Sequence, residues 1–364
     1  MRSVRSIDVA TLAYERWMAA RCQIDRADLA AKHAAMEADE FAFLRATFYR
    51  WAELFQTACA DLTRAPRVLG VGDVHLENFG TWRDAEGRLV WGVNDFDEAC
   101  PIPYTNDLVR LASSAWIASN ADRLSLRSNA ACSSILDGYK EGLAAGGSPF
   151  VLSERNRWLR DAVTSGFRDP AGYWGKFALL PDVERTPPQV MKLLREAMPQ
   201  GAEEGFRVVH RRAGLGSLGR PRYTAIAQWK GGNVSREAKS ILPSVWRFPQ
   251  DRNVAERSYY REIADLAARA PDPFLDVRSD WLIRRISPYC SRIELRQLPR
   301  KRDEARLLFA MGWELANVHV GARGARARIG VDLDRRKAKW LSNAAEIMVD
   351  ATHRDWKAWA KRSR

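Results

Sequence analysis

The sequence predicts an α+β fold in which a β-rich segment interrupts a mostly helical chain. Apolar residues recur every three or four positions in residues 8–62 and from Asp107 to about Pro199, which is the period of amphipathic helices. Around residues 206–241, alternating and β-branched runs are separated by glycine clusters, a pattern typical of a meander of strands. Helical periodicity returns in residues 303–321. We therefore expect two lobes, one helical and one rich in strands.

The expected boundaries follow these changes of period. Residues 1–202 form a helical lobe that contains the polar loops of residues 67–110, residues 203–295 form the β-rich lobe, and residues 296–364 are helices that return to the helical lobe. The chain has 364 residues, of which 46% are hydrophobic and 28% charged, and this suits one large domain or two tightly joined lobes. The composition excludes a disordered chain, a coiled coil and a disulfide-stapled mini-protein.

The sequence gives no sign of a membrane segment or a disulfide framework. No stretch approaches the roughly 18–20 uninterrupted apolar residues of a membrane helix, and Asp8, Glu15 and Arg16 interrupt the apolar positions near the N-terminus. The five cysteines are scattered and form no C-x-x-C pair. We expect a cytoplasmic protein with no membrane partner, and the sequence leaves its oligomeric state open.

Charge is distributed unevenly along the chain. The formal net charge is +13, which suits nucleic acid or a phosphorylated ligand as a partner, although the excess is mostly Arg spread along the whole sequence. Between Gly70 and Arg110, however, eight acidic residues stand against three basic ones. Oxygen ligands clustered against the overall trend indicate a hard divalent cation, Mg²⁺ or Mn²⁺.

The elements of the first half follow in order. Residues 8–62 read as packing helices that end at Arg64-Ala-Pro66, and a short strand of residues 67–71 then runs into a polar loop flanked by glycines. A second strand, residues 88–93, follows the turn at Glu86-Gly87 and ends in a second acidic loop. We expect the two acidic loops to meet at the ends of one hairpin.

The second half adds the meander and a further helix, strand and helix. After the strands of residues 206–241, residues 253–270 read as a helix, 279–287 as a strand and 303–321 as a long helix that contains His319. The basic tail from Arg323 is expected to be helical.

The two acidic loops carry the residue types that phosphoryl transfer from a nucleotide requires. One carboxylate must lie near the attacking hydroxyl, and an Asn and a further carboxylate must hold the metal that bridges the phosphates. Asp73 and Asn78, five positions apart, and Asp95 beyond the next strand supply this set, and Asp97 is a second candidate metal ligand or a brace. Asp and Asn are also common turn formers, so any one of them alone carries little weight.

A glycine-rich segment offers a second half of such a site. Gly214, Gly216, Ser217 and Gly219 belong to a G-x-G-x-x-G pattern followed by Pro221 and a strand-like run. In kinases, the glycine loop lies between two strands, and its backbone amides cover phosphates. In a dinucleotide-binding fold, a helix would begin directly after the glycines. The alternative is an ordinary glycine hairpin.

Cations follow the glycine pattern. Arg236 and Lys239 lie after the turn at Gly231-Gly232, and Glu262 on the next helix is a candidate ion-pair partner of the kind that holds a phosphate-binding Lys. Solvated charges on strands and helices are the commoner reading. In the acidic segment, His75 is expected to brace its loop and Asp107 to anchor that loop from a helix start.

These motifs carry a resemblance to known families. GDVHLENF and NDFDEA are similar to the catalytic loop and metal-binding motif of aminoglycoside phosphotransferases and choline kinases, which belong to the protein-kinase-like superfamily. The chain resembles more closely the bacterial domain-of-unknown-function family 2252. That closer resemblance rests on the blocks FAFLR, GDVHLENFG, NDFDEA, DLVRLASS, GLGSLG and LANVHVGA, which extend from about residue 40 to residue 320.

The resemblance implies a two-lobed protein-kinase-like fold that binds ATP and Mg²⁺ (or Mn²⁺). Asp73 would orient or deprotonate an acceptor hydroxyl, Asn78 and Asp95 would hold metal, and the glycines would cover the phosphates. In ordinary kinases the glycine loop precedes the catalytic loop, so the order here requires a circular permutation, with the end of the His319 helix beside the strand that begins at Arg67.

One departure concerns the phosphate-binding cation. The family has Lys-Glu-Ala where this chain has Arg236-Glu237-Ala238. Arg is not equivalent to Lys in such a position, so the role falls to Arg236, passes to Lys239, or is lost, which would make the protein a pseudokinase.

The sequence therefore favours a Mg²⁺-dependent ATP phosphotransferase that acts on a hydroxyl of a small molecule, whose identity it does not specify. A non-catalytic nucleotide-binding regulator and a nucleic-acid-binding protein are the alternatives. A metallophosphoesterase is less favoured: Gly-Asp-x-His opens such sites too, but the further Gly-Asp and Gly-Asn-His blocks are missing.

Overall fold

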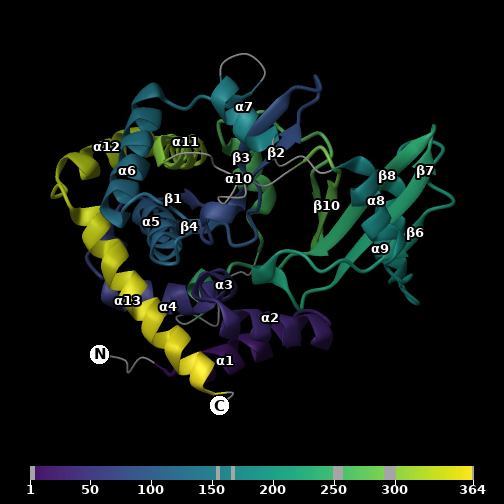
Figure 1. Cartoon of the computed structure of the whole chain (residues 1–364), viewed down its shortest axis with the longest axis horizontal. Coiled ribbons are helices and arrows are strands. Elements are labelled where there is room, and N and C mark those ends of the chain that lie inside the picture. Colours follow the sequence, from purple (N-terminus) through teal and green to yellow (C-terminus); the bar gives the residue numbers. More distant parts are fainter. Residues whose placement is uncertain (1–4, 153–155, 165–168, 249–256, 291–300, 363–364) are drawn as a thin grey trace.

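A computed structural model of the chain describes residues 5–152, 156–164, 169–248, 257–290 and 301–362, and it has an α+β architecture (Figure 1). Most helices gather on one side of the molecule and the largest antiparallel sheet lies on the other. The helices are α1 (Ile7–Ala19), α2 (Arg26–Ala38), α3 (Glu40–Ala46), α4 (Phe48–Ala58), α5 (Tyr104–Asn120), α6 (Ser128–Ala145), α7 (Arg157–Thr164), α8 (Pro170–Ala178), α9 (Pro188–Ala197), α10 (Tyr260–Leu266), α11 (Lys301–His319), α12 (Ala325–Asp334) and α13 (Trp340–Lys361).

The strands form three antiparallel sheets in the order β1-β4, β2-β3-β5 and β6-β7-β8-β10-β9. They are β1 (Arg67–Gly70), β2 (Phe79–Arg83), β3 (Leu89–Val93), β4 (Cys100–Pro103), β5 (Phe150–Val151), β6 (Arg207–Val209), β7 (Arg222–Trp229), β8 (Gly232–Ser240), β9 (Asp276–Arg278) and β10 (Trp281–Arg285). The predicted meander and the predicted strand of residues 279–287 thus belong to one five-stranded sheet. Residues 253–256 of the predicted helix 253–270 lie outside the described residues, and α10 begins at Tyr260.

The two faces of the five-stranded sheet have different partners. Ala225, Ala238 and Ile283 pack in one apolar cluster with α9, which covers that face. Side chains alternate along a strand, so Lys239 of β8 lies on the other face, as do the residues paired with it, Arg222 of β7 and Leu282 of β10. That second face therefore carries Lys239, the cation that reaches the acidic loops.

The hairpin that the sequence predicts between residues 67–71 and residues 88–93 does not form. The turn at Glu86-Gly87 does join a hairpin, but its strands are β2 and β3, whereas β1 pairs with β4. The chain leaves β1 at Gly72, which has a positive φ of 79° and lies so close to the Glu98 carbonyl that an added Cβ would be 2.4 Å from that oxygen. This turn carries the chain away from β1, and pairing resumes only at Phe79.

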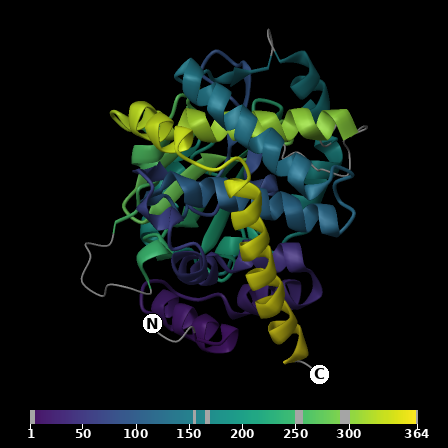
Figure 2. The ribbon, with the colours of Figure 1, turned by 90° about the vertical axis from the view of Figure 1, so that its left-hand side faces the viewer.

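The long helices pack closely on the helical side. Figure 2 shows α11 crossing α6, with α13 on the outside of this part of the molecule. Glycines make the crossing of α6 and α11 tight, because a Cβ on Gly138 would lie 1.9 Å from the Phe309 carbonyl oxygen and one on Gly312 would lie 2.0 Å from the Ile135 carbonyl oxygen. No helix in the described residues is both long and apolar enough to cross a bilayer.

We expect Gly138→Ala to destabilise the fold strongly. The added methyl group would meet backbone atoms of α11, which cannot move aside as a flexible side chain can. Overpacking of this kind costs roughly 1–3 kcal/mol and occasionally more, although alanine favours the helix itself by about 1 kcal/mol. Urea unfolding measures the change, with Gly330→Ala on α12 as the control because nothing lies near its added Cβ. An equal midpoint for both variants would contradict the tight crossing.

Candidate functional site

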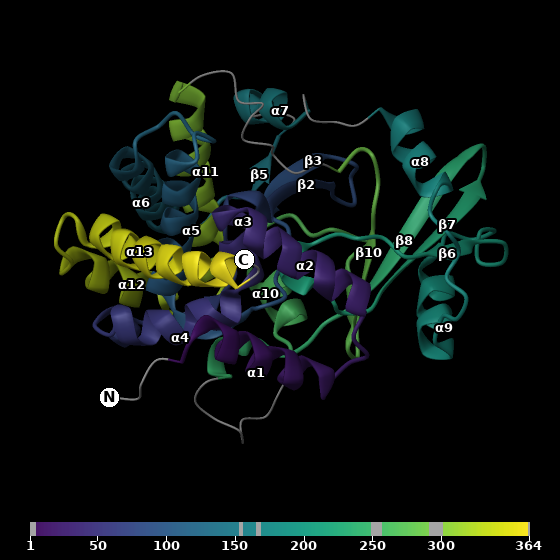
Figure 3. The ribbon, with the colours of Figure 1, turned by 60° about the horizontal axis from the view of Figure 1, so that its bottom comes forward.

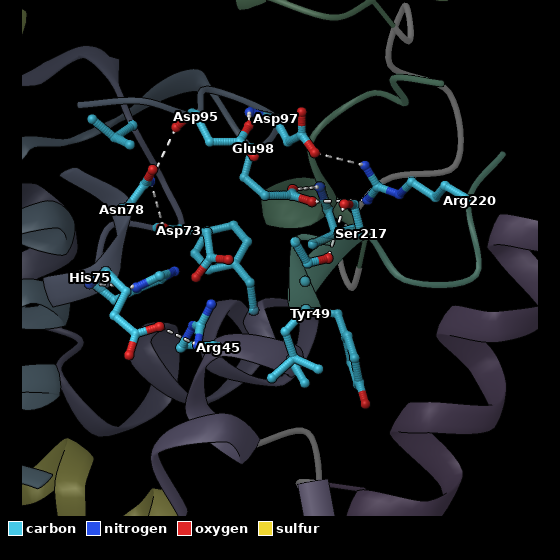
Figure 4. Close-up of a pocket in the computed structure, with 18 of the residues that line it drawn as sticks. Arg45, Tyr49, Asp73, His75, Asn78, Asp95, Asp97, Glu98, Ser217 and Arg220 are labelled. Atoms are coloured by element: carbon cyan, nitrogen blue, oxygen red, sulfur yellow. Dashed lines mark hydrogen bonds and ion pairs between the residues drawn. The ribbon is translucent and has the colours of Figure 1, made fainter. Parts of the chain in front are cut away.

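The glycine loop, residues Gly214–Gly219, and the two acidic loops line one pocket (Figure 4). The loop joins β6 to β7 and contains a short 3₁₀ turn, Leu215–Ser217, so strands flank it on both sides as its sequence predicted. Residues 141 positions apart in sequence, Asp73 and Gly214, therefore face the same space. The remaining wall comes from α1, α3 and α4, through residues such as Tyr14, Arg45 and Tyr49.

Asp73 lies where the glycine loop comes closest to the helical side. Its Oδ1 accepts a hydrogen bond from Nε of Arg110 at 2.9 Å, and Arg110 is fully buried on α5. A Cβ on Gly216 would lie 3.3 Å from Oδ2 of Asp73, so the glycine allows the loop to approach this oxygen. Burial raises the pKa of Asp73, and Arg110 only partly opposes that effect. One oxygen is thus held and the other faces the pocket.

A buried network anchors the loop that carries Asp73. Both oxygens of Asp107 accept backbone hydrogen bonds, from Val71 at 2.6 Å and Gly72 at 2.9 Å, and Nε2 of His319 lies 3.0 Å from Oδ2. Asp107 and His319 are both fully buried. The end of α11 therefore lies next to the end of β1, as expected for the His319 helix and the strand beginning at Arg67.

Two further residues brace the acidic loops. Asn78 donates from Nδ2 to the backbone carbonyls of Asp73 at 3.2 Å and of Asp95 at 3.0 Å, so its amide joins the two loops. The ring of His75 accepts a hydrogen bond from the Glu77 amide at its Nδ1. His75 thus contacts its own loop, and His75 and Asn78 both line the pocket.

Asp95 and Asp97 meet Lys239 at the other side of the pocket. The Lys239 ammonium lies 2.8 Å from Oδ2 of Asp95 and 2.5 Å from Oδ2 of Asp97, and it is 1% exposed. Burial alone would raise the pKa of Asp95, but Lys239 and Arg284 outweigh burial and lower it. Burial and the neighbouring charge of Asp95 raise the pKa of Asp97. The pair therefore combines a carboxylate that stays ionised with one that protonates more readily.

Arg220, which directly follows the glycine loop, joins that loop to the second acidic loop. Its guanidinium lies 3.2 Å from Oε1 of Glu98 and 3.7 Å from Oδ2 of Asp97. Glu98 also accepts the Val245 amide at 2.8 Å. Burial raises the pKa of Glu98 to about 7, with Arg220 opposing. The sheet and the helical side are thus held together by a buried ion pair at the pocket.

Two of the predicted cation-site residues lie elsewhere. Arg236 is on the opposite face of β8, where its Nε donates to the Ala197 carbonyl of α9 and its guanidinium lies over the Phe274 ring. Glu262 does not hold Lys239: it pairs with Arg257 at 2.8 Å, and its side chain is 42% exposed. The reason is the face of α10, which buries Tyr260 and Ile263 and leaves Glu262 outside. Of the two candidate cations, Lys239 is the one at the acidic loops.

Glu237, between those two cations, is fully buried among arginines. Its carboxylate pairs with Arg211 at 2.6 Å, with Arg222 at 2.6 Å and with Arg284 at 2.7 Å. Burial would raise the pKa of Glu237, but the three guanidinium groups hold it well below its usual range. Arg222 also donates to the Ser217 hydroxyl at 3.1 Å, so this cluster supports the glycine loop from the sheet side.

The acidic loops offer oxygen donors that fit a divalent cation. Oδ1 of Asp97 is buried and has no hydrogen-bond partner within the described part of the chain, and both aspartates present carboxylates near Asn78. Among the described residues, the group of His, Cys, Asp and Glu side chains with metal-ligand spacing is Asp25, Asp28 and His210. His210 and Arg212 already hold both oxygens of Asp28, so ion pairing accounts for that group.

One protein family matches the part of the chain that carries the acidic loops. Residues 24–160 match the model of a family described as an uncharacterized protein conserved in bacteria, DUF2252. No curated protein and no solved structure matches the chain. The match confirms the resemblance to that family over this segment, which carries both acidic loops, and the family description names no activity. The glycine loop and Lys239 lie outside the matched residues.

Several residues at the site were not predicted from the sequence: Lys32, Arg45, Glu98, Arg110 and Arg220 all reach the pocket or the loops that form it. Arg110 had a readable signal, because it is the one cation in the run DLVRLASSAWIAS, whose apolar positions predict a buried helix, and a buried cation requires a partner. The other four resemble the many surface charges of the chain, and only the fold brings them together.

Proposed function

We propose that this protein is a Mg²⁺-dependent phosphotransferase that transfers a phosphoryl group from ATP to a hydroxyl of a small molecule. The observation that carries the proposal is one pocket lined by Asp73, the glycine loop and Asp95, with the buried Lys239 paired to Asp95 behind its wall. Phosphoryl transfer requires little beyond positioning and charge stabilisation, and these are the parts it uses.

Each part has a distinct task in this proposal. The free oxygen of Asp73 accepts the proton of the acceptor hydroxyl, and Arg110 fixes the orientation of the carboxylate. The raised pKa of Asp73 makes it a stronger base than an exposed aspartate. The glycine loop covers the phosphates, and Lys239 supplies a positive charge to them from the sheet.

The metal fits the second acidic loop. Asp95 and Asp97, with the Asn78 amide at the same pocket, are the residues that would hold Mg²⁺, and Oδ1 of Asp97 has no hydrogen-bond partner among the described residues. When bound, such an ion neutralises charge on the phosphates. The chain itself keeps Asp95 ionised by means of Lys239 and Arg284.

A circularly permuted kinase-like fold accounts for the arrangement. The glycine loop and the Lys239 strand belong to one antiparallel sheet, as they do in kinases, although they follow the catalytic loop in sequence. The contact of His319 with Asp107 joins the end of α11 to the loop that follows β1, where an unpermuted chain would run on directly. These features support the superfamily assignment as part of the proposal.

We expect ATP with Mg²⁺ to raise the melting temperature of the protein. A ligand that binds only the folded state stabilises it by RT ln(1 + [L]/Kd), which is about 2.7 kcal/mol when the ligand is at a hundred times its Kd. Differential scanning fluorimetry and calorimetry measure the effect, with ATP and EDTA as the control. Incubation with a metabolite extract and mass spectrometry then identifies the phosphorylated acceptor. The absence of both heat and a thermal shift at millimolar ATP-Mg²⁺ would overturn the proposed function.

A non-catalytic nucleotide-binding regulator is the second candidate. The observation in its favour is that Lys239 already pairs with Oδ2 of Asp95 and Oδ2 of Asp97, so part of their negative charge is balanced without a metal. ATP affinity without any turnover, in the presence of the full extract, would favour this alternative.

A further inference from the structure

The glycine loop is held from outside the pocket by the N-terminal helices. In Figures 1 and 3, α2 runs from the helical side toward the end of the five-stranded sheet. The Asp25 amide, at the start of α2, donates to the Gly219 carbonyl at 2.9 Å. Asp28 pairs with His210 at 3.0 Å and with Arg212 at 2.8 Å, just before the loop. Contacts from α2 thus fix both ends of the loop.

The middle of the loop is held by a buried lysine. Lys32 of α2 is 2% exposed, and its Nζ donates to the Gly216 carbonyl at 2.8 Å. The ammonium also lies over the Tyr14 ring, 5.3 Å from the centroid. Gly216 lines the pocket and Lys32 does not, so this bond draws the carbonyl to the outer side of the loop. On its inner side, Gly216 faces Asp73.

The interior disfavours the charged form of Lys32. Burial, with a further contribution from Arg220, lowers the pKa of Lys32 to about 8, while Glu15, Asp73 and Glu98 oppose the shift. The unfolded chain therefore binds more protons than the folded chain between pH 8 and the ordinary lysine pKa, and stability rises with pH in that window. What places Lys32 at this position is its hydrogen bond to the Gly216 carbonyl, on the loop that lines the pocket.

We propose that Lys32 is a positioning residue for nucleotide phosphates. It holds the Gly216 carbonyl away from the pocket, so that the amide groups of the loop face the phosphates. Its positive charge also attracts the phosphates from behind the loop. This inference rests on the proposed function. A carbonyl turned inward would place its negative end against phosphate oxygens, whereas amide donors complement them. Lys32 lies within the family-matched segment and the glycine loop lies outside it, so the contact joins two distant parts of the chain.

The test compares ATP-Mg²⁺ binding by wild-type protein and by Lys32→Met, Lys32→Arg and Lys192→Met. Methionine keeps the length of the side chain without its charge or donors, and Lys192 is an exposed lysine of α9 that serves as the control. We expect Lys32→Met to raise the ATP Kd about tenfold or more, as expected for one hydrogen bond from a charged donor, without lowering the melting temperature of the nucleotide-free protein. Lys32→Arg should recover part of the affinity.

The pH profile supplies a readout that a merely structural lysine would not move. The titratable and charged groups that face Lys32 are Tyr14, Glu15, Asp73, Glu98 and Arg220, and all of them remain in the Met variant. Wild-type affinity should fall more steeply than that of Lys32→Met between pH 7 and pH 9, since only the wild type loses the Lys32 charge there. Equal affinities and parallel pH profiles, or a loss of affinity that merely follows a lower melting temperature, would overturn the inference. No binding by the wild type would instead overturn the proposed function, and this inference with it.

Discussion

Asp73→Asn should lower turnover by roughly 10²–10⁴, the usual contribution of a positioned general base, while ATP affinity changes by less than about threefold. The amide has nearly the same shape as the carboxylate and keeps an oxygen toward Arg110, but it cannot accept the acceptor's proton. The change leaves the fully buried Arg110 without its ion-pair partner, so some loss of stability accompanies it. Rates are therefore measured well below the melting temperature of the variant.

Asp95→Ala is the matched comparison, because it removes a carboxylate at the same pocket with a different task. It should weaken Mg²⁺-dependent ATP binding and leave metal-free nucleotide affinity nearly unchanged. Calorimetry with and without EDTA, beside turnover with the acceptor found in extracts, separates the two variants. If both variants lost nucleotide binding to the same extent, Asp73 and Asp95 could not have the separate roles proposed for them.

The sequence was most informative where local chemistry and spacing are sufficient. Asp73, Asn78 and Asp95 were expected at one site because two strands end in acidic loops, and the structure places all three on one pocket. The alternation of β8 decides between the two cations: Arg236 packs against α9 and Lys239 meets Asp95. Strand alternation alone shows that Arg236 and Lys239 face opposite ways, but not which of them faces the helical side.

Long-range partners were not predictable from spacing. Glu262 was a candidate only because kinases use an acid on the helix after the lysine strand. In the structure, α10 turns Tyr260 inward instead. The Tyr260 ring packs edge to face on the ring of Phe96, which follows Asp95 in sequence. Lys32 precedes Gly216 by 184 residues, and nothing in the sequence of α2 marks its one lysine as buried. The pairing of β1 with β4 was missed because β4, with the sequence CPIP, carries two prolines and lacks a strand pattern.

Asp107→Asn should cost about 3–5 kcal/mol of stability, the effect of breaking a buried ionic network by changing one partner. Four donors converge on this fully buried carboxylate, from Val71, Gly72, Asn106 and His319. An asparagine has one acceptor oxygen and an NH₂ group, so at least one backbone amide of the loop would face another donor. Urea unfolding measures the loss, and the exposed Asp137 provides a control, since Asp137→Asn should stay within about 0.5 kcal/mol of the wild type.

The same network tests whether α11 sets the position of the catalytic loop. His319→Leu removes the donor from α11 and leaves the backbone bonds of Asp107 in place, so it should cost less stability than Asp107→Asn. In a double-mutant cycle the two changes should be strongly non-additive, because they share one hydrogen bond at 3.0 Å. A helix that serves only as packing would give additive losses and leave turnover per folded molecule unchanged. If the end of α11 instead supports Asp73 through Asp107 and the loop after β1, His319→Leu should lower turnover while ATP affinity stays near that of the wild type.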